Sequence, residues 1–125
     1  MLKKFLPLLA APLLLAGCNA TFTNLTPHQQ TRSTNNLYRV EVALASRQQS
    51  LRWDSIQPKI VVGTDSYPMR PTSLMTNRFE GLVPVPATVG LIHYHYKFDF
   101  NYNALGNPRP DSAVSPDYTL KVVEQ

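Results

Sequence analysis

The chain has 125 residues, a formal net charge of +4 and a single cysteine. This length predicts one domain with a hydrophobic core, and one cysteine excludes both an internal disulfide and a cluster of thiolate metal ligands. Beyond the first few residues the Lys and Arg side chains are dispersed singly, so no basic patch for nucleic acid is found.

The first segment, MLKKFLPLLAAPLLLAG, has the parts of a secretory signal. Two lysines precede an apolar run of about a dozen residues, Phe5 to Ala16, which is too short to span a bilayer. Pro7 and Pro12 interrupt it further. We therefore predict that residues 1–17 are a removed signal peptide. The 108 residues that remain of the 125 carry a net charge of +2, because both lysines of the signal are lost.

The end of this segment, Leu15-Ala16-Gly17-Cys18, resembles the lipobox of bacterial lipoproteins, in which a leucine and two small residues precede a cysteine. The resemblance implies that Cys18 becomes the first mature residue and carries a diacylglycerol and an acyl chain such as palmitate, since stable anchoring needs more than one chain. Asn19 resembles the pattern that sends such proteins to the outer membrane of a Gram-negative cell. The alternative is an ordinary secretory signal with a chance cysteine.

Residues 18–21 are then expected to be a lipidated tether, and residues 22–125 the folded domain. Nine of the eleven prolines lie in this mature part, with Tyr, Val, Thr and Phe between them, so strands are favoured over helices. In residues 37–45, alternation predicts one core-facing side, made of Tyr38, Val40, Val42 and Leu44.

The other segments follow from alternation and turn residues. We expect an edge strand at 21–27, a loop at 28–36, an excursion packing Trp53 on the core at 51–56, a hairpin at 58–69, a connection at 70–77, an edge or interrupted strand at 78–86, a long strand at 90–102, a turn-rich stretch at 104–116 and a last strand at 118–125.

About seven strands at this spacing are typical of an antiparallel β-sandwich. Their order and lengths resemble an immunoglobulin-like or fibronectin-III-like sandwich, with 90–102 and 117–124 as strands F and G and without the disulfide of antibody domains. A transthyretin-like or jelly-roll arrangement is the alternative. The layout of Asn24–Pro27, Ile60–Val62 and Tyr67–Met69 also resembles small lipoproteins of unassigned function, which implies no activity.

The long strand places His93 and His95 on one face, about 6.5–7 Å apart. Such a pair supplies two ligands to a divalent metal, which needs at least a third. His28 is the only other histidine, and Asp99 lies further along the same face. The favoured alternative is that both histidines simply face solvent on the polar side of the strand; a response to acidic pH is a further one.

The other face of this strand is aromatic. Its alternation predicts that Tyr96, Phe98 and Phe100 lie in the core, whereas Tyr94 and Tyr102, near the ends, reach the surface with their hydroxyls. Together with Trp53, these two tyrosines are the candidate contacts for a carbohydrate. For Trp53 itself, burial in the core is the favoured alternative.

The sequence contains no GxSxG, SxxK or glycine-rich phosphate loop, and no obvious pair of carboxylates for glycoside hydrolysis. We therefore expect a non-enzymatic protein without a cofactor. The predicted function is protein interaction or structural support by an envelope lipoprotein, with residues 21–26 or 78–84 as edges that accept a partner strand. A carbohydrate-binding module and a weak metal site at His93 and His95 are the alternatives.

Overall fold

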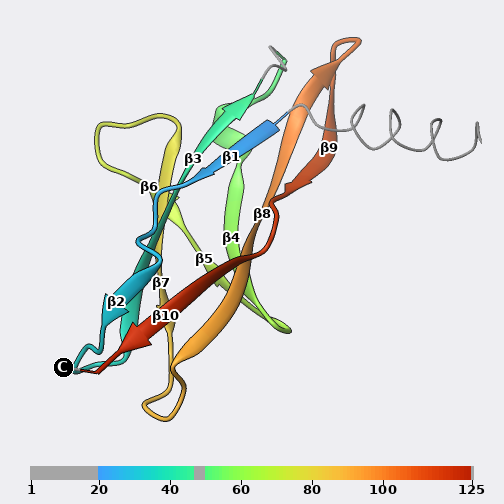
Figure 1. Cartoon of the computed structure of the whole chain (residues 1–125). Coiled ribbons are helices and arrows are strands. Elements are labelled where there is room, and N and C mark those ends of the chain that lie inside the picture. The colour runs from blue at the N-terminus through green and yellow to red at the C-terminus, as the bar shows by residue number, and fades with distance from the viewer. Residues whose placement is uncertain (1–19, 47–49, 125) are drawn as a thin grey trace, which may run out of the picture.

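The computed structural model describes residues 20–46 and 50–124, which form two layers of strands (Figure 1). The signal peptide, Cys18 and Asn19 lie outside the described residues. The elements are β1 (Ala20–Asn24), β2 (Gln29–Thr31), β3 (Leu37–Ser46), a 3-10 helix (Trp53–Ser55), β4 (Gln57–Val62), β5 (Asp65–Pro68), β6 (Arg70–Pro71), β7 (Arg78–Pro84), β8 (Leu91–Ala104), β9 (Asn107–Val114) and β10 (Tyr118–Val123).

The strand order places the domain among the immunoglobulin-like β-sandwiches. One sheet has the order β1-β3-β7-β6, and the other has the order β2-β10-β8-β4-β5. β9 also pairs with β8, along the part of β8 that follows its pairing with β10. These orders correspond to strands ABED and GFC of an immunoglobulin domain, with β5 added beside strand C. The prediction of a sandwich of this class is confirmed, without a disulfide because the chain has one cysteine.

The first strand is divided between the two sheets. β1 pairs antiparallel with β3, and after Pro27 the chain crosses to the other sheet, where β2 pairs in parallel with β10. The loop predicted at 28–36 therefore contains a short strand. Its sequence, QQT, is wholly polar and therefore gives no alternation signal. β2 is held in place by its backbone pairing with β10.

The core fills the space between the sheets. Tyr38, Val40, Val42 and Leu44 of β3 are buried, and Phe98 of β8 faces them from the other sheet. The ring of Phe98 meets those of Phe22 and Phe79 edge to face, with ring centroids 5.2 and 5.0 Å apart. The predicted core faces of β3 and β8 are thus confirmed, including Tyr96 and Phe100.

The prediction of a turn-rich stretch at 104–116 is wrong, because residues 107–114 form β9. A two-residue turn at Leu105 and Gly106 joins β8 to β9, and both residues have positive φ. Pro108 and Pro110 are two residues apart, so both rings take the place of N–H groups on the outer side of an edge strand, where no ladder bond is lost.

Two smaller expectations also differ from the structure. The connection at 70–77 includes the two-residue strand β6. β1 begins at Ala20, so two residues of the expected tether belong to the strand.

No helix in the described part of the chain is long and apolar enough to cross a membrane.

Candidate functional site

A group of hydrogen-bonded side chains joins the two sheets where the first strand crosses between them. The Tyr96 hydroxyl donates to Asn24 Oδ1 at 2.6 Å and lies 3.2 Å from Thr26 Oγ1. Thr26 Oγ1 also accepts the Glu41 N–H at 2.8 Å. Burial raises the pKa of Tyr96 well above its usual value, so its hydroxyl stays protonated. The group is a structural clasp between the two sheets.

Tyr94 belongs to the same group, and the prediction that its hydroxyl reaches the surface is wrong. Its side chain is 1% exposed, and its hydroxyl accepts a hydrogen bond from Asn24 Nδ2 at 2.9 Å. Asn24, which the sequence does not mark as special, is the polar partner that allows this tyrosine to be buried. Tyr102, at the other end of the strand, is half-buried.

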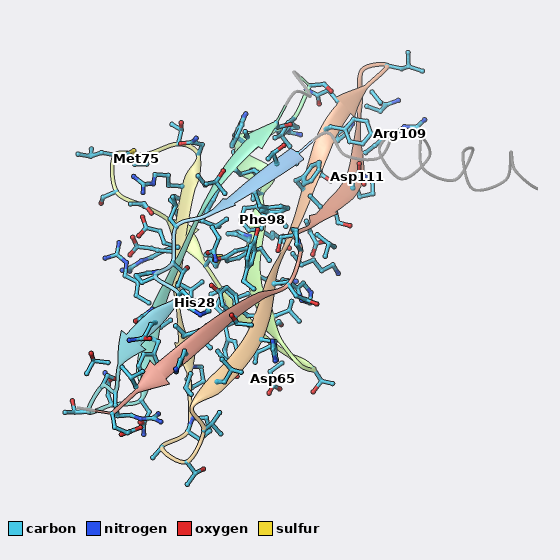
Figure 2. The ribbon with its side chains drawn as sticks, in the orientation of Figure 1. His28, Asp65, Met75, Phe98, Arg109 and Asp111 are labelled. Atoms are coloured by element: carbon cyan, nitrogen blue, oxygen red, sulfur yellow. The ribbon has the colours of Figure 1, made fainter. Side chains whose placement is uncertain are left out.

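The two histidines lie on the outer face of β8, as the alternation predicts. His93 is exposed, and His95 is half-buried with its Nδ1 3.4 Å from Asp117 Oδ1. His28, labelled in Figure 2, lies 3.3 Å from Thr119 Oγ1, and Thr119 is the residue paired with His93. Among the described residues, no three His, Cys, Asp or Glu side chains come together as metal ligands. The pair therefore has no third ligand beside it.

Trp53 is on the surface, so the prediction that it packs in the core is wrong. It begins the 3-10 helix and is 43% exposed. The helix is held to the hairpin of β8 and β9 by backbone bonds, with Arg52 N–H donating to Asn101 O at 3.0 Å. The core position is filled instead by Leu51, which bridges to Tyr102 and is buried.

A polar groove of about 400 Å³ lies beside this helix. Its lining comes from the 3-10 helix, β4, β8 and β9, and consists mainly of amide, carboxylate and hydroxyl side chains: Ser55, Gln57, Asp99, Phe100, Asn101, Pro110, Asp111 and Ser112. Asp111 is labelled on β9 in Figure 2. Such groups suit hydrogen bonding to a polar ligand.

The open side of β7 forms a second, larger groove of about 600 Å³. β6 pairs only with Phe79 and Glu80, although β7 continues to Pro84. The Arg78 carbonyl accepts from Thr72 N–H on the β6 side, and residues two apart along a strand present their backbone groups to the same side. The N–H and C=O of Leu82 therefore face the open edge.

The walls of this groove are apolar on one side and charged on the other. Tyr67 and Pro68 end β5, Met69 follows them, and Leu82 is 54% exposed. On the charged side, the carboxylate of Glu80 forms ion pairs with Arg39 at 2.9 Å and with Arg70 at 3.3 Å. Burial opposes the ionisation of Glu80, but the two arginines outweigh it and hold its pKa below the usual value.

Gly81 allows the two walls to approach each other. A Cβ at this position would lie 2.9 Å from Pro68 O and 3.0 Å from Ile60 Cδ1. Only glycine leaves room for the end of β5 to pack directly on β7. The sequence gives one hint of this: a glycine in the middle of a strand signals close backbone approach.

Comparisons with known proteins give no function. No protein-family model and no curated protein matches the sequence. Among solved structures, a DUF4785 family protein of Legionella pneumophila is 9% identical with a TM-score of 0.45; the match covers 82% of this chain and 28% of that protein's length. Murine CRIg is 11% identical with a TM-score of 0.45, over 84% and 98% of the two chains. The fold assignment rests on the strand order.

Proposed function

We propose that this chain is a non-enzymatic lipoprotein of the bacterial envelope, anchored through Cys18, whose sandwich binds an extended segment of another envelope protein along the open edge of β7. The anchoring is supported by the lipobox and by the start of β1 at Ala20, two residues after Cys18. Such spacing leaves a short tether between lipid and domain. With Asn19 next to the cysteine, we place the protein in the outer membrane.

The observation that carries the binding proposal is that no described strand pairs with β7 on the β6 side beyond Glu80, where Leu82 lies beside an apolar wall. A strand that lies along this edge gains ladder bonds from Leu82 and side-chain contacts with Tyr67 and Pro68. Pro84 has no N–H, which limits the ladder to a few residues. The partner segment is therefore expected to be short and to contain apolar side chains.

The charged side adds direction to this contact. Three arginines share two carboxylates on this face, which leaves one net positive charge. Glu80 pairs with Arg39 and Arg70, and Glu41 pairs with Arg39 and Arg78. An acidic side chain in the partner segment would be attracted to it. Because the side chains of Arg39 and Arg70 are largely exposed, the attraction is expected to weaken as the salt concentration rises.

A photoreactive amino acid in place of Leu82 tests the proposal in intact envelopes. It is expected to give a discrete adduct with one protein, identified by mass spectrometry. The control is the same substitution at Leu91, which is 50% exposed but lies on the other sheet. Equal adducts at both positions, or none at Leu82, would contradict binding at this edge.

Carbohydrate binding is the second candidate, and the exposure of Trp53 favours it. Its indole is available as a platform for a sugar ring, and Ser55, two residues further on, lines the polar groove. Trp53→Ala would then abolish retention on envelope polysaccharide. The same change would leave the adduct at Leu82 unaltered, so the two functions are separable.

A further inference from the structure

Two leucines stand fully exposed in turns where a leucine is strained. Leu74 and Leu105 are 104% and 96% exposed, with φ of +64° and +51°. Apolar residues such as leucine avoid this left-handed conformation, and an exposed leucine gains nothing from burial within its own domain. Elsewhere in the described chain, the left-handed turns use Asn36 and Gly63, which tolerate it. The two leucines therefore lower the stability of the domain, and no contact within the described part of the domain offsets this loss.

Both turns lie at the end of the sandwich where the chain enters. Ala20 pairs with Ser46 at the end of β3, and the loop that holds Leu74 leads into β7, whose Arg78 pairs with Ala43. Figure 1 shows this loop and the turn between β8 and β9 on either side of the start of β1. We call this the entry end.

Two further apolar side chains belong to the entry end. Met75 follows Leu74 in the same loop and points away from the body of the domain (Figure 2), and it is 43% exposed. Trp53 is equally exposed, beside the stem of the hairpin that carries Leu105. Indole rings are favoured where an apolar phase meets water.

The tether from Cys18 to Ala20 is shorter than the distance by which the hairpin of β8 and β9 extends past Ala20. Phe22 lies against Phe98, and Asn24 bonds to Tyr94, so β1 and β8 run in opposite directions. β8 continues six residues past Phe98, whereas β1 begins two residues before Phe22. At about 3.4 Å per residue, the hairpin extends roughly 10–14 Å past Ala20. The two residue steps from Ala20 to Cys18 span at most about 7 Å, even when the chain is fully extended.

We infer that the entry end is a membrane-contacting surface, on which Leu74 and Leu105 insert into the interface of the bilayer that holds the lipid on Cys18. This rests on the proposed lipidation, since the short tether is what brings these turns to the bilayer. The contact fixes the orientation of the domain, so that the open edge of β7 is presented sideways to the membrane.

Trp53 is the only tryptophan of the chain and reports the contact directly. The lipidated protein is reconstituted in phosphatidylethanolamine and phosphatidylglycerol vesicles that contain lipids brominated near the headgroup. We expect these lipids to quench its fluorescence and a Leu74→Asn, Leu105→Asn variant to lose at least half of the quenching. Asparagine tolerates positive φ, so this variant keeps its fold, which its melting temperature verifies.

The matched control is a Leu82→Asn, Leu91→Asn variant, in which two leucines of 54% and 50% exposure away from the entry end are changed. It should be quenched like the unchanged protein. Flotation of the same samples separates the two proposals. Protein that does not float with vesicles overturns both lipid anchoring and the membrane contact.

Two results would overturn the membrane contact alone. The first is protein that floats without quenching by brominated lipid; if Trp53 is then also shielded from aqueous iodide, a second copy or a partner protein covers the entry end. The second is equal quenching in the asparagine variant.

Discussion

Replacing Tyr96 with phenylalanine is expected to lower the free energy of unfolding by about 2–3 kcal/mol, because a buried group left without its partner costs about 1–3 kcal/mol. The hydroxyl of Tyr96, a fully buried residue, donates to Asn24 Oδ1 at 2.6 Å and lies 3.2 Å from both Thr26 Oγ1 and the Glu41 carbonyl, so the change removes these contacts together. Urea unfolding at neutral pH measures the change. The control is Tyr102→Phe, at a half-buried position where the described residues offer the hydroxyl no hydrogen bond. Equal losses in both variants would contradict the clasp.

The same tyrosine gives a signature at alkaline pH. Burial raises its pKa above the value of 10.0 that holds in the unfolded chain. Below pH 10 both states are protonated and the contribution of the hydroxyl is complete. Above pH 10 only the unfolded tyrosine loses its proton, so stability falls by about 1.4 kcal/mol per pH unit for this group. Tyr96→Phe should make the fall less steep, whereas an unchanged slope would contradict a protonated clasp.

Gly81→Ala is the second change with a large expected effect, at about 1–3 kcal/mol of lost stability. The new methyl group would meet a backbone carbonyl, Pro68 O, which moves only with the end of β5. That movement also deforms the apolar wall of the groove. We therefore expect the adduct at Leu82 to weaken together with the melting temperature.

Gly90→Ala is the matched control for this change. A Cβ on Gly90 meets no atom closer than 3.7 Å, Val122 O, so the substitution introduces no clash. Reduced freedom of the unfolded chain is then the main effect, and it stabilises by about 0.4–1 kcal/mol. A loss at Gly90 as large as that at Gly81 would show that close packing is not what requires the glycine.

Strands with a strong side-chain pattern were predictable. In β3 and β8 every second residue is large and apolar, and the burial of Val40, Val42, Phe98 and Phe100 follows from that pattern alone. β9 was not predictable, because its sequence, NPRPDSAV, has no apolar alternation. It is a strand because β8 is long enough to need a second partner beyond β10.

The candidate site was predictable in part. A strand at 78–84 with limits set by its prolines is what the structure contains, but the open edge depends on β6 being only two residues long. Nothing in the local sequence sets that length. For Trp53, composition favours burial, and only the tertiary pairing of Leu51 with Tyr102 shows that the core position is already taken. Asn24 was missed because its partner, Tyr94, is 70 residues away.

Lipid anchoring decides how both surfaces are presented, and the mature N-terminal peptide tests it most directly. Mass spectrometry of protein extracted from the envelope is predicted to find a first residue, Cys18, whose mass includes a diacylglycerol and an acyl chain. Cys18→Ala should then leave the unprocessed precursor, with residues 1–17 still attached. A mature chain that begins elsewhere, an unmodified Cys18, or normal processing of the alanine variant would contradict the lipoprotein assignment.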